Sequence, residues 1–172
     1  MASPNKLSHI VMQTNRLAEM RDWYCTVLSA KPAFDNGKMA FLAYDEEHHR
    51  VGLLSIDDYA VPERATVGLQ HMSFTYDSLE TLFENYHRLK AESILPAWTV
   101  NHGPTISMYY ADPDGNQVEL QVDVFETNEE VDAFITGPIF QENPRGADFD
   151  PEEMFAQLRA GTPFEVLTRR TH

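Results

Sequence analysis

The sequence predicts an α+β protein, built from two related copies of a strand–helix–multi-strand unit and a helical C-terminal extension. A short apolar run followed by a helical stripe occurs twice, 62 residues apart. A dense turn between two β-rich runs predicts a hairpin over residues 106–122. The residues after about 125 hold strong helix-start signals but no third copy.

The first copy opens with a strand over residues 7–13. Asn15 or Thr14 can cap the helix that follows, and apolar residues recur at helical spacing, namely Leu17, Met20, Tyr24, Val27 and Leu28. Residues 31–37, with Pro32 and Gly37, are expected to break this helix. Strands over 38–44 and 50–56 flank an acidic turn at 45–47, and residues 57–66 are expected to be a linker.

The second copy repeats this order, with a strand over residues 68–74 and a helix capped by Asp77 or Ser78. The helix carries an apolar stripe of Leu79, Leu82, Phe83, Tyr86 and Leu89. After a break at 91–96, strands over 106–110 and 117–122 flank the turn Asp112–Asn116. Placing His9 on His71 also aligns Leu17 with Leu79 and Tyr24 with Tyr86. We therefore predict one paired domain over residues 1–125, with modules at about 7–60 and 68–125.

The remaining residues, 126–172, form the predicted helical extension. Thr127 or Asn128 begins a short helix to about Ile135, which Gly137 and Pro138 end. Asp150 is a strong helix cap, with Pro151 in the first helical position and Glu153 placed for a capping box. The segment is too apolar for a free tail, so we expect it to be part of the folded unit.

Composition excludes several classes of partner. The formal net charge is −14 and basic residues form no run, which argues against nucleic acid and anionic membranes. The single cysteine, Cys25, excludes an internal disulfide and suits a reducing compartment. No apolar run approaches the ~20 residues that a membrane span needs. We expect a cytoplasmic protein, and a homo-oligomer such as a dimer.

Two histidines occupy equivalent positions in the copies, each in the middle of a predicted strand: His9 and His71. Pseudo-symmetry is expected to bring such positions together near its axis. Glu119 alternates with apolar residues on the last strand, so it faces either a concavity or solvent. Two imidazoles and one carboxylate are the ligand set of an open Fe(II) site, which Mn(II), Zn(II) and Ni(II) also accept. Gly52 stands in the first copy where Glu119 stands in the second, so a fourth carboxylate ligand is missing.

These residues, with the segment Tyr109–Glu119, resemble the vicinal oxygen chelate superfamily, and within it the type I extradiol (catechol 2,3-dioxygenase-like) enzymes. The resemblance covers residues 7 to about 125. It implies two βαβββ modules that form a cupped, partly open mixed β-barrel. It also implies that His9, His71 and Glu119 hold Fe(II), and that O2 opens a catechol-type aromatic diol.

The same resemblance implies three catalytic roles. His49, in the pair His48–His49, would be the acid–base group. Tyr109, ten residues before Glu119, would hydrogen-bond the substrate. His102 lies in a loop like the family's histidine-bearing loop, although at a different spacing, and could help to orient the substrate.

Other interpretations stay open on the sequence alone. His48 and His49 could lie in a solvated turn, and Tyr109 could be core packing with its hydroxyl at the rim. The chain could also be another metal enzyme on the same scaffold, such as a glyoxalase-like lyase or a thiol transferase. The third alternative is a metal-free protein that binds a small molecule.

Overall fold

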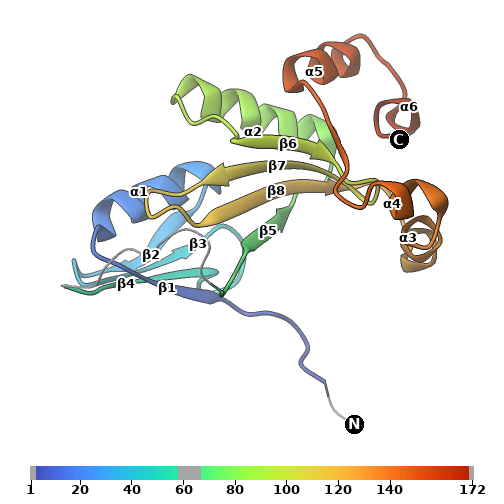
Figure 1. Ribbon diagram of the computed structural model, residues 1–172. Helices are drawn as coiled ribbons and strands as arrows, with labels where there is room; N and C mark the ends of the chain where they lie inside the picture. Colours follow the sequence, from blue (N-terminus) through green and yellow to red (C-terminus); the bar gives the residue numbers. More distant parts are fainter. Residues whose placement is uncertain (1–2, 58–66, 171–172) are drawn as a thin grey trace. The chain divides into compact units, whose positions relative to one another are not determined.

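The computed structural model describes residues 3–57 and 67–170, and it confirms the predicted α+β class (Figure 1). The linker predicted at 57–66 lies outside the described residues from position 58 onward. In chain order the elements are β1 (Ile10–Thr14), α1 (Leu17–Val27), β2 (Lys31–Asp35), β3 (Met39–Ala43), β4 (Val51–Ser55), β5 (His71–Thr75), α2 (Leu79–Ala91), β6 (Trp98–Asn101), β7 (Thr105–Ala111), β8 (Gln117–Asp123), α3 (Asn128–Ile135), α4 (Pro138–Glu142), β9 (Ala147–Asp148), α5 (Pro151–Arg159) and α6 (Phe164–Leu167).

The chain divides into two compact units. The first contains Met1–Gly68 together with the hairpin turn Asp112–Asn116, and the second contains Leu69–Ala111 and Gln117–His172. The described strands form two open mixed sheets, one for each unit, and no closed barrel. The predicted domain boundaries, 1–125 and 126–172, stay a prediction. None of the helices in the described ranges is long and apolar enough to cross a membrane.

The sheet of the first unit has the strand order β1-β4-β3-β2, in which β1 and β4 are parallel and the other pairs antiparallel. Helix α1 packs on this sheet through its predicted apolar stripe, whose members Leu17, Met20, Tyr24 and Val27 are all buried. The predicted side-chain cap is absent, because Arg16 is the N-cap residue and makes no side-chain cap bond. Thr14 instead accepts a hydrogen bond from the Arg16 backbone N–H (3.0 Å).

The sequence did not predict one strand of the first unit. Residues 31–35, which we expected only to break the helix, form the edge strand β2 against β3. All five residues of β2 are exposed, so no buried face marks the strand in the sequence. Pro32 is tolerated there because proline has no backbone N–H, and the outer side of an edge strand needs no hydrogen bond to a neighbouring strand.

The sheet of the second unit has the order β5-β8-β7-β6-β9. Helix α2 begins at a capping box in which Ser78 and Thr81 satisfy each other's backbone N–H groups, so Ser78 is the cap. The hairpin β7–β8 is present as predicted, with a longer first strand. Strand β6 was missed, and it forms the antiparallel neighbour of β7.

The register of the sheets confirms the internal repeat. In the first unit Val11 of β1 lies opposite Gly52 of β4, and in the second Ser73 of β5 lies opposite Glu119 of β8. Val11 and Ser73 are separated by the same 62 positions that align the two copies. Gly52 therefore occupies the strand position that corresponds to Glu119, as the sequence predicted.

The two histidines do not lie in the middle of strands, which corrects the prediction. His71 is the first residue of β5, and His9 directly precedes β1. Ladder pairing begins at Ile10 opposite Val51 and at His71 opposite Gln117. The histidines therefore stand where their sheets begin.

In the C-terminal extension, helices α3 and α5 begin at the capping residues that the sequence predicted. Thr127 and Glu130 form a capping box at α3, and Asp150 accepts from the backbone N–H groups of Glu152 and Glu153 at α5. The Glu153 side chain accepts from Gln157 (3.3 Å), and the side-chain cap of α5 is Asp150. Gly137 and Pro138 end α3 as predicted, and they also begin the short helix α4.

Candidate metal and substrate site

The sheet of the second unit carries a buried carboxylate on β8. Glu119 on β8 and Tyr109 on β7 are direct cross-strand neighbours, and the two residues are 4% and 7% exposed. The Tyr109 hydroxyl donates to Glu119 Oε1 (2.9 Å). This burial excludes a solvated outer face for Glu119, since a carboxylate out of water needs hydrogen bonds or a cation. Burial, together with the negative charge of Glu119, raises the pKa of Tyr109, so its phenol stays protonated at neutral pH.

His71 contacts the second carboxylate oxygen of Glu119. Its Nε2 lies 3.1 Å from Glu119 Oε2, and its ring stands edge-on to that of Tyr109. Gln70 Nε2 donates to Gln117 Oε1 (2.8 Å), which leaves Gln70 Oε1 as the acceptor for His71 Nδ1. Nδ1 therefore carries its hydrogen, and a neutral His71 ring presents the Nε2 lone pair to a carboxylate oxygen.

Two lone pairs that face each other need a cation between them. A proton can fill this role, and so can a metal ion that both atoms bind. First-row ions such as Zn²⁺ bind nitrogen and oxygen at about 2.0–2.2 Å, so ligands at right angles are about 3 Å apart. The measured 3.1 Å fits this separation, and the donor types fit a divalent transition metal.

His102 reaches the same cluster from the loop between β6 and β7. Its Nδ1 lies 2.7 Å from the Arg145 carbonyl oxygen and its Nε2 lies 3.1 Å from the Tyr109 hydroxyl. Since a carbonyl only accepts, Nδ1 is the protonated nitrogen. Tyr109 has one phenol hydrogen and two neighbours, Glu119 and His102. The phenol hydrogen can point to Glu119 or to His102, but not to both at once.

An aromatic wall beside Tyr109 was missed by the sequence analysis. The Trp98 ring stacks on that of Tyr109 with centroids 4.9 Å apart, and the Arg145 guanidinium lies 4.7 Å from the centroid of the Trp98 ring. Trp98 Nε1 donates to Asp148 Oδ1 (2.8 Å). Trp98 is the register partner of Tyr109, so recognising β6 as a strand would have found it.

The first unit holds a cluster of rings. His9 stacks on His49 with centroids 4.3 Å apart, and the Phe41 ring stacks on His49 at 4.6 Å. His48 is exposed, and its ring contacts both His9 and His49. The pKa of His49 is lowered, mainly by burial and further by the charges of the neighbouring His9 and His48. Its imidazole is therefore neutral at pH 7. His49 is therefore packed between rings and is not simply solvated.

The predicted ligands are divided between the units. His71 and Glu119 belong to the second unit and lie in contact, and His9 belongs to the first. Among the residues that the structure describes, neither unit by itself gathers three or more His, Cys, Asp or Glu side chains that could hold a metal ion. The three-ligand set stays a prediction.

Comparisons with known proteins agree with this fold. A sequence model of the Glyoxalase/Bleomycin resistance protein/Dioxygenase superfamily matches residues 6–120. Two proteins of Rhodococcus globerulus are similar along almost the whole chain. Biphenyl-2,3-diol 1,2-dioxygenase 2 is 43% identical over 98% of this chain and 89% of its own length. Biphenyl-2,3-diol 1,2-dioxygenase 3 is 44% identical over 96% of this chain and 88% of its own length.

Solved structures with low sequence identity share the fold. Lactoylglutathione lyase from Agrobacterium tumefaciens has a TM-score of 0.56 at 19% identity, over 70% of this chain and 96% of its own. The fosfomycin resistance protein FosX from Listeria monocytogenes has a TM-score of 0.56 at 23% identity, over 76% of this chain and 98% of its own. At such identities the likeness shows a common fold and no common reaction.

Proposed function

The chain belongs to the Glyoxalase/Bleomycin resistance protein/Dioxygenase superfamily, and we propose that it is an extradiol dioxygenase that opens a catechol-type aromatic diol with O2. The two Rhodococcus relatives support this reaction, since they are 43% and 44% identical to the chain. Their name places cleavage between carbons 1 and 2 of a 2,3-diol, which is a bond beside the diol and not between its two hydroxylated carbons. This agrees with the activity expected from the sequence, and a biphenyl-type diol is the first substrate to test.

The metal is the next part of the proposal. The observation that carries it is the contact between His71 Nε2 and Glu119 Oε2, whose facing lone pairs call for a cation. We propose that His9 of the first unit joins them as the third ligand, and that the ion is Fe(II), with Mn(II), Zn(II) and Ni(II) as alternatives that this donor set accepts. When bound, Fe(II) supplies a Lewis acid that acidifies a diol hydroxyl and the redox chemistry that O2 requires.

The side chains around these ligands would manage the protons of the reaction. His49 is neutral at pH 7, so it can accept the proton that a diol hydroxyl gives up. Tyr109 keeps its phenol hydrogen because its pKa is raised, and by turning this hydrogen away from Glu119 it could donate to a charged substrate oxygen. His102 is held by the Arg145 carbonyl with Nε2 towards Tyr109, and can therefore orient that hydroxyl.

Burial of the cluster supports its proposed role as a substrate site. The Tyr109 phenol and the Glu119 carboxylate are almost out of solvent, so hydrogen bonds and charges there act in a low dielectric. Trp98 covers one face of the Tyr109 ring and gives it a fixed orientation. We propose that this aromatic surface also contacts the ring of the substrate.

Gly52 argues against a lyase of the glyoxalase type. Gly52 lies at the strand position equivalent to Glu119, and a Cβ at Gly52 would approach Val11 Cγ2 to 3.1 Å. A second carboxylate ligand at that position is therefore missing. We further propose a cytoplasmic homo-oligomer, a dimer in the simplest case, and light scattering of the purified protein tests its mass.

One experiment tests the reaction and its metal together. The protein is loaded with Fe(II) without oxygen and then mixed with 2,3-dihydroxybiphenyl or catechol in air-saturated buffer. We expect O2 uptake and a yellow ring-fission product, together with about one metal ion per chain, as a single three-ligand site requires. A muconate-type product would contradict cleavage beside the diol. The absence of O2 uptake at full metal occupancy would contradict the dioxygenase assignment.

A further inference from the structure

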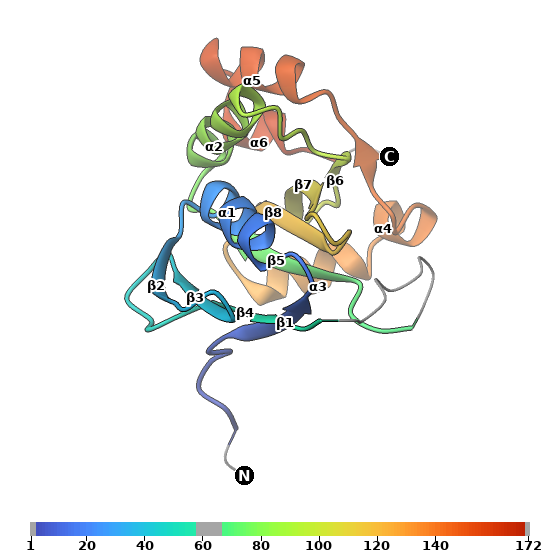
Figure 2. The same ribbon diagram turned by 90° about the vertical axis from the view of Figure 1, so that its left-hand side faces the viewer.

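The chain segment before β1 carries His9 but belongs to no strand. Residues 3–9 are exposed, and Leu7 is 77% exposed although its side chain is apolar. Figure 2 shows this segment leaving the end of β1 as an extended chain. Ladder pairing of β1 starts at Ile10, so among the described residues no strand pairing holds the backbone on the N-terminal side of His9.

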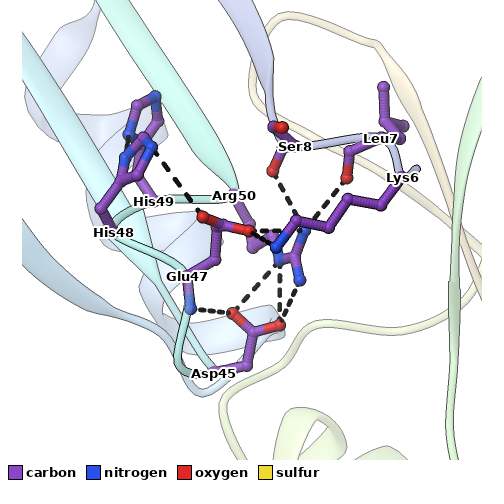
Figure 3. A network of polar contacts seen from close by, with 8 residues as sticks. All are labelled: Lys6, Leu7, Ser8, Asp45, Glu47, His48, His49 and Arg50. Carbon is purple, nitrogen blue, oxygen red and sulfur yellow. Dashed lines mark hydrogen bonds and ion pairs between the residues drawn. The ribbon is translucent and has the colours of Figure 1, made fainter. Parts of the chain in front are cut away.

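Arg50, which directly precedes β4, binds the backbone of this segment. One guanidinium nitrogen, Nη1, donates to the backbone carbonyls of Leu7 (3.0 Å) and Ser8 (3.1 Å) (Figure 3). The Arg50 carbonyl accepts from the backbone N–H of Ile10 (3.0 Å). Arg50 therefore binds the backbone on both sides of His9.

Arg50 is itself fixed by the turn that carries His48 and His49. Its Nε and Nη2 both donate to Asp45 Oδ2 (2.9 and 2.8 Å), and Nε also lies 3.2 Å from Oδ1, so one edge of the planar guanidinium faces the carboxylate. Asp45 Oδ1 also accepts from the backbone N–H of Glu47 (3.1 Å). A second link runs from Glu47 to Lys6, as Figure 3 shows.

We propose that Arg50 is a positioning residue that holds His9 in place as a metal ligand. The proposal rests on the proposed function, because it takes His9 as the third ligand. The guanidinium uses one edge for Asp45 and its remaining nitrogen for two carbonyls, so it ties the His9 backbone to the turn beside His49. Lysine has a single compact ammonium group and cannot keep this arrangement.

The test compares metal binding in matched variants, with Co(II) as a spectroscopic probe. Arg50→Met keeps the aliphatic stem and removes every guanidinium contact. Arg21→Met is the control, because Arg21 binds Asp22 and Asp35 in the same unit, has similar exposure (29% against 22%) and holds no His9 backbone. We expect Co(II) affinity to fall about tenfold or more in Arg50→Met, as for residues that orient metal ligands, and to stay within about twofold in Arg21→Met.

A second readout follows His9 itself. Imidazole N–H resonances that Co(II) shifts should come from two ligand histidines in the unaltered protein and from one in His9→Ala. In Arg50→Met one of these resonances should weaken or broaden, while thermal unfolding in the absence of metal changes no more than in Arg21→Met. If Arg50→Met does not fold, Arg50→Lys, which keeps the charge, takes its place in both measurements.

The outcomes separate the two proposals. Unchanged Co(II) affinity in His9→Ala would overturn the ligand assignment, and with it the proposed function of His9. Weak binding in His9→Ala but normal binding in Arg50→Met and Arg50→Lys would overturn the positioning role alone. Equal losses in Arg50→Met and Arg21→Met would also overturn it, because general destabilisation would then explain both.

Discussion

Replacing Gly146 by alanine should disturb the candidate site from outside it. Gly146 directly follows Arg145, whose carbonyl accepts from His102 Nδ1, and directly precedes β9. Its φ of +110° is a conformation that alanine adopts only under strain. An added Cβ would lie 2.6 Å from the Asn101 carbonyl oxygen and 2.7 Å from Val100 Cγ2, and real Cβ atoms essentially never come closer than 3.0 Å. The extension must then move away from β6 by at least about 0.4 Å (3.0 minus 2.6 Å).

The expected magnitudes follow from this geometry. The backbone conformation costs alanine about 1–2 kcal/mol, and the forced displacement brings the total loss of stability to about 2–4 kcal/mol. The hydrogen bond from His102 to Arg145 would lengthen from 2.7 Å to about 3.1 Å or more. A neutral hydrogen bond is worth about 0.5–1.5 kcal/mol, so its loss should slow kcat roughly 2- to 13-fold.

Gly161→Ala is a matched control. Gly161 also has a positive φ, +82°, but nothing lies within 4 Å of the Cβ that alanine would add. The Gly161→Ala variant should therefore lose only about 1–2 kcal/mol of stability, and its kcat should be unchanged. Stability is measured by denaturant unfolding, and kcat with the Fe(II)-loaded proteins well below both melting temperatures. Equal effects of the two substitutions would refute the clash, and a normal kcat in a destabilised Gly146→Ala would refute the link between the extension and His102.

Three further predictions concern the site and the extension. His49→Ala should keep its metal but lose ~10²–10⁴ in turnover, the usual contribution of general acid–base catalysis; loss of metal in elemental analysis would contradict this. Tyr109→Phe should slow turnover with iron still bound, because it removes the hydroxyl that lies between His102 and Glu119; an unaltered kcat would exclude that role. Truncation after Val124 should cause aggregation or loss of activity in light-scattering and O2-uptake assays, and a soluble, active fragment would show that the extension is dispensable.

Local signals in the sequence were enough for the hairpin and for most helix starts. Asp112–Asn116 is a turn because Asp112 accepts from the backbone N–H groups of Asp114 and Asn116, a pattern fixed within five residues. Ser78, Thr127 and Asp150 cap their helices for the same reason, since each cap uses atoms no more than three residues away. Such contacts depend little on the rest of the fold.

The edge strands could not be predicted in this way. β2 is exposed along its whole length, and β6 has only four residues. Both are strands because a neighbouring strand supplies their hydrogen bonds, and this pairing is a tertiary contact. Missing β6 also concealed Trp98, whose place beside Tyr109 depends on the β6–β7 register. The contact between His102 and the Arg145 carbonyl joins residues 43 positions apart, and a backbone acceptor leaves no mark in the sequence.

The two copies of the repeat show how one scaffold can supply different chemistry. At equivalent strand positions the second copy places Glu119 opposite Ser73, and the first places Gly52 opposite Val11. Ser73 leaves room for a carboxylate and also donates to Gln121 on the same face. Val11 lies 3.1 Å from where a Cβ at Gly52 would be, so a longer side chain there would have to displace it. The repeat therefore supplies a histidine in each copy but a carboxylate in only one. This asymmetry agrees with the proposed three-ligand metal site, which keeps coordination positions open.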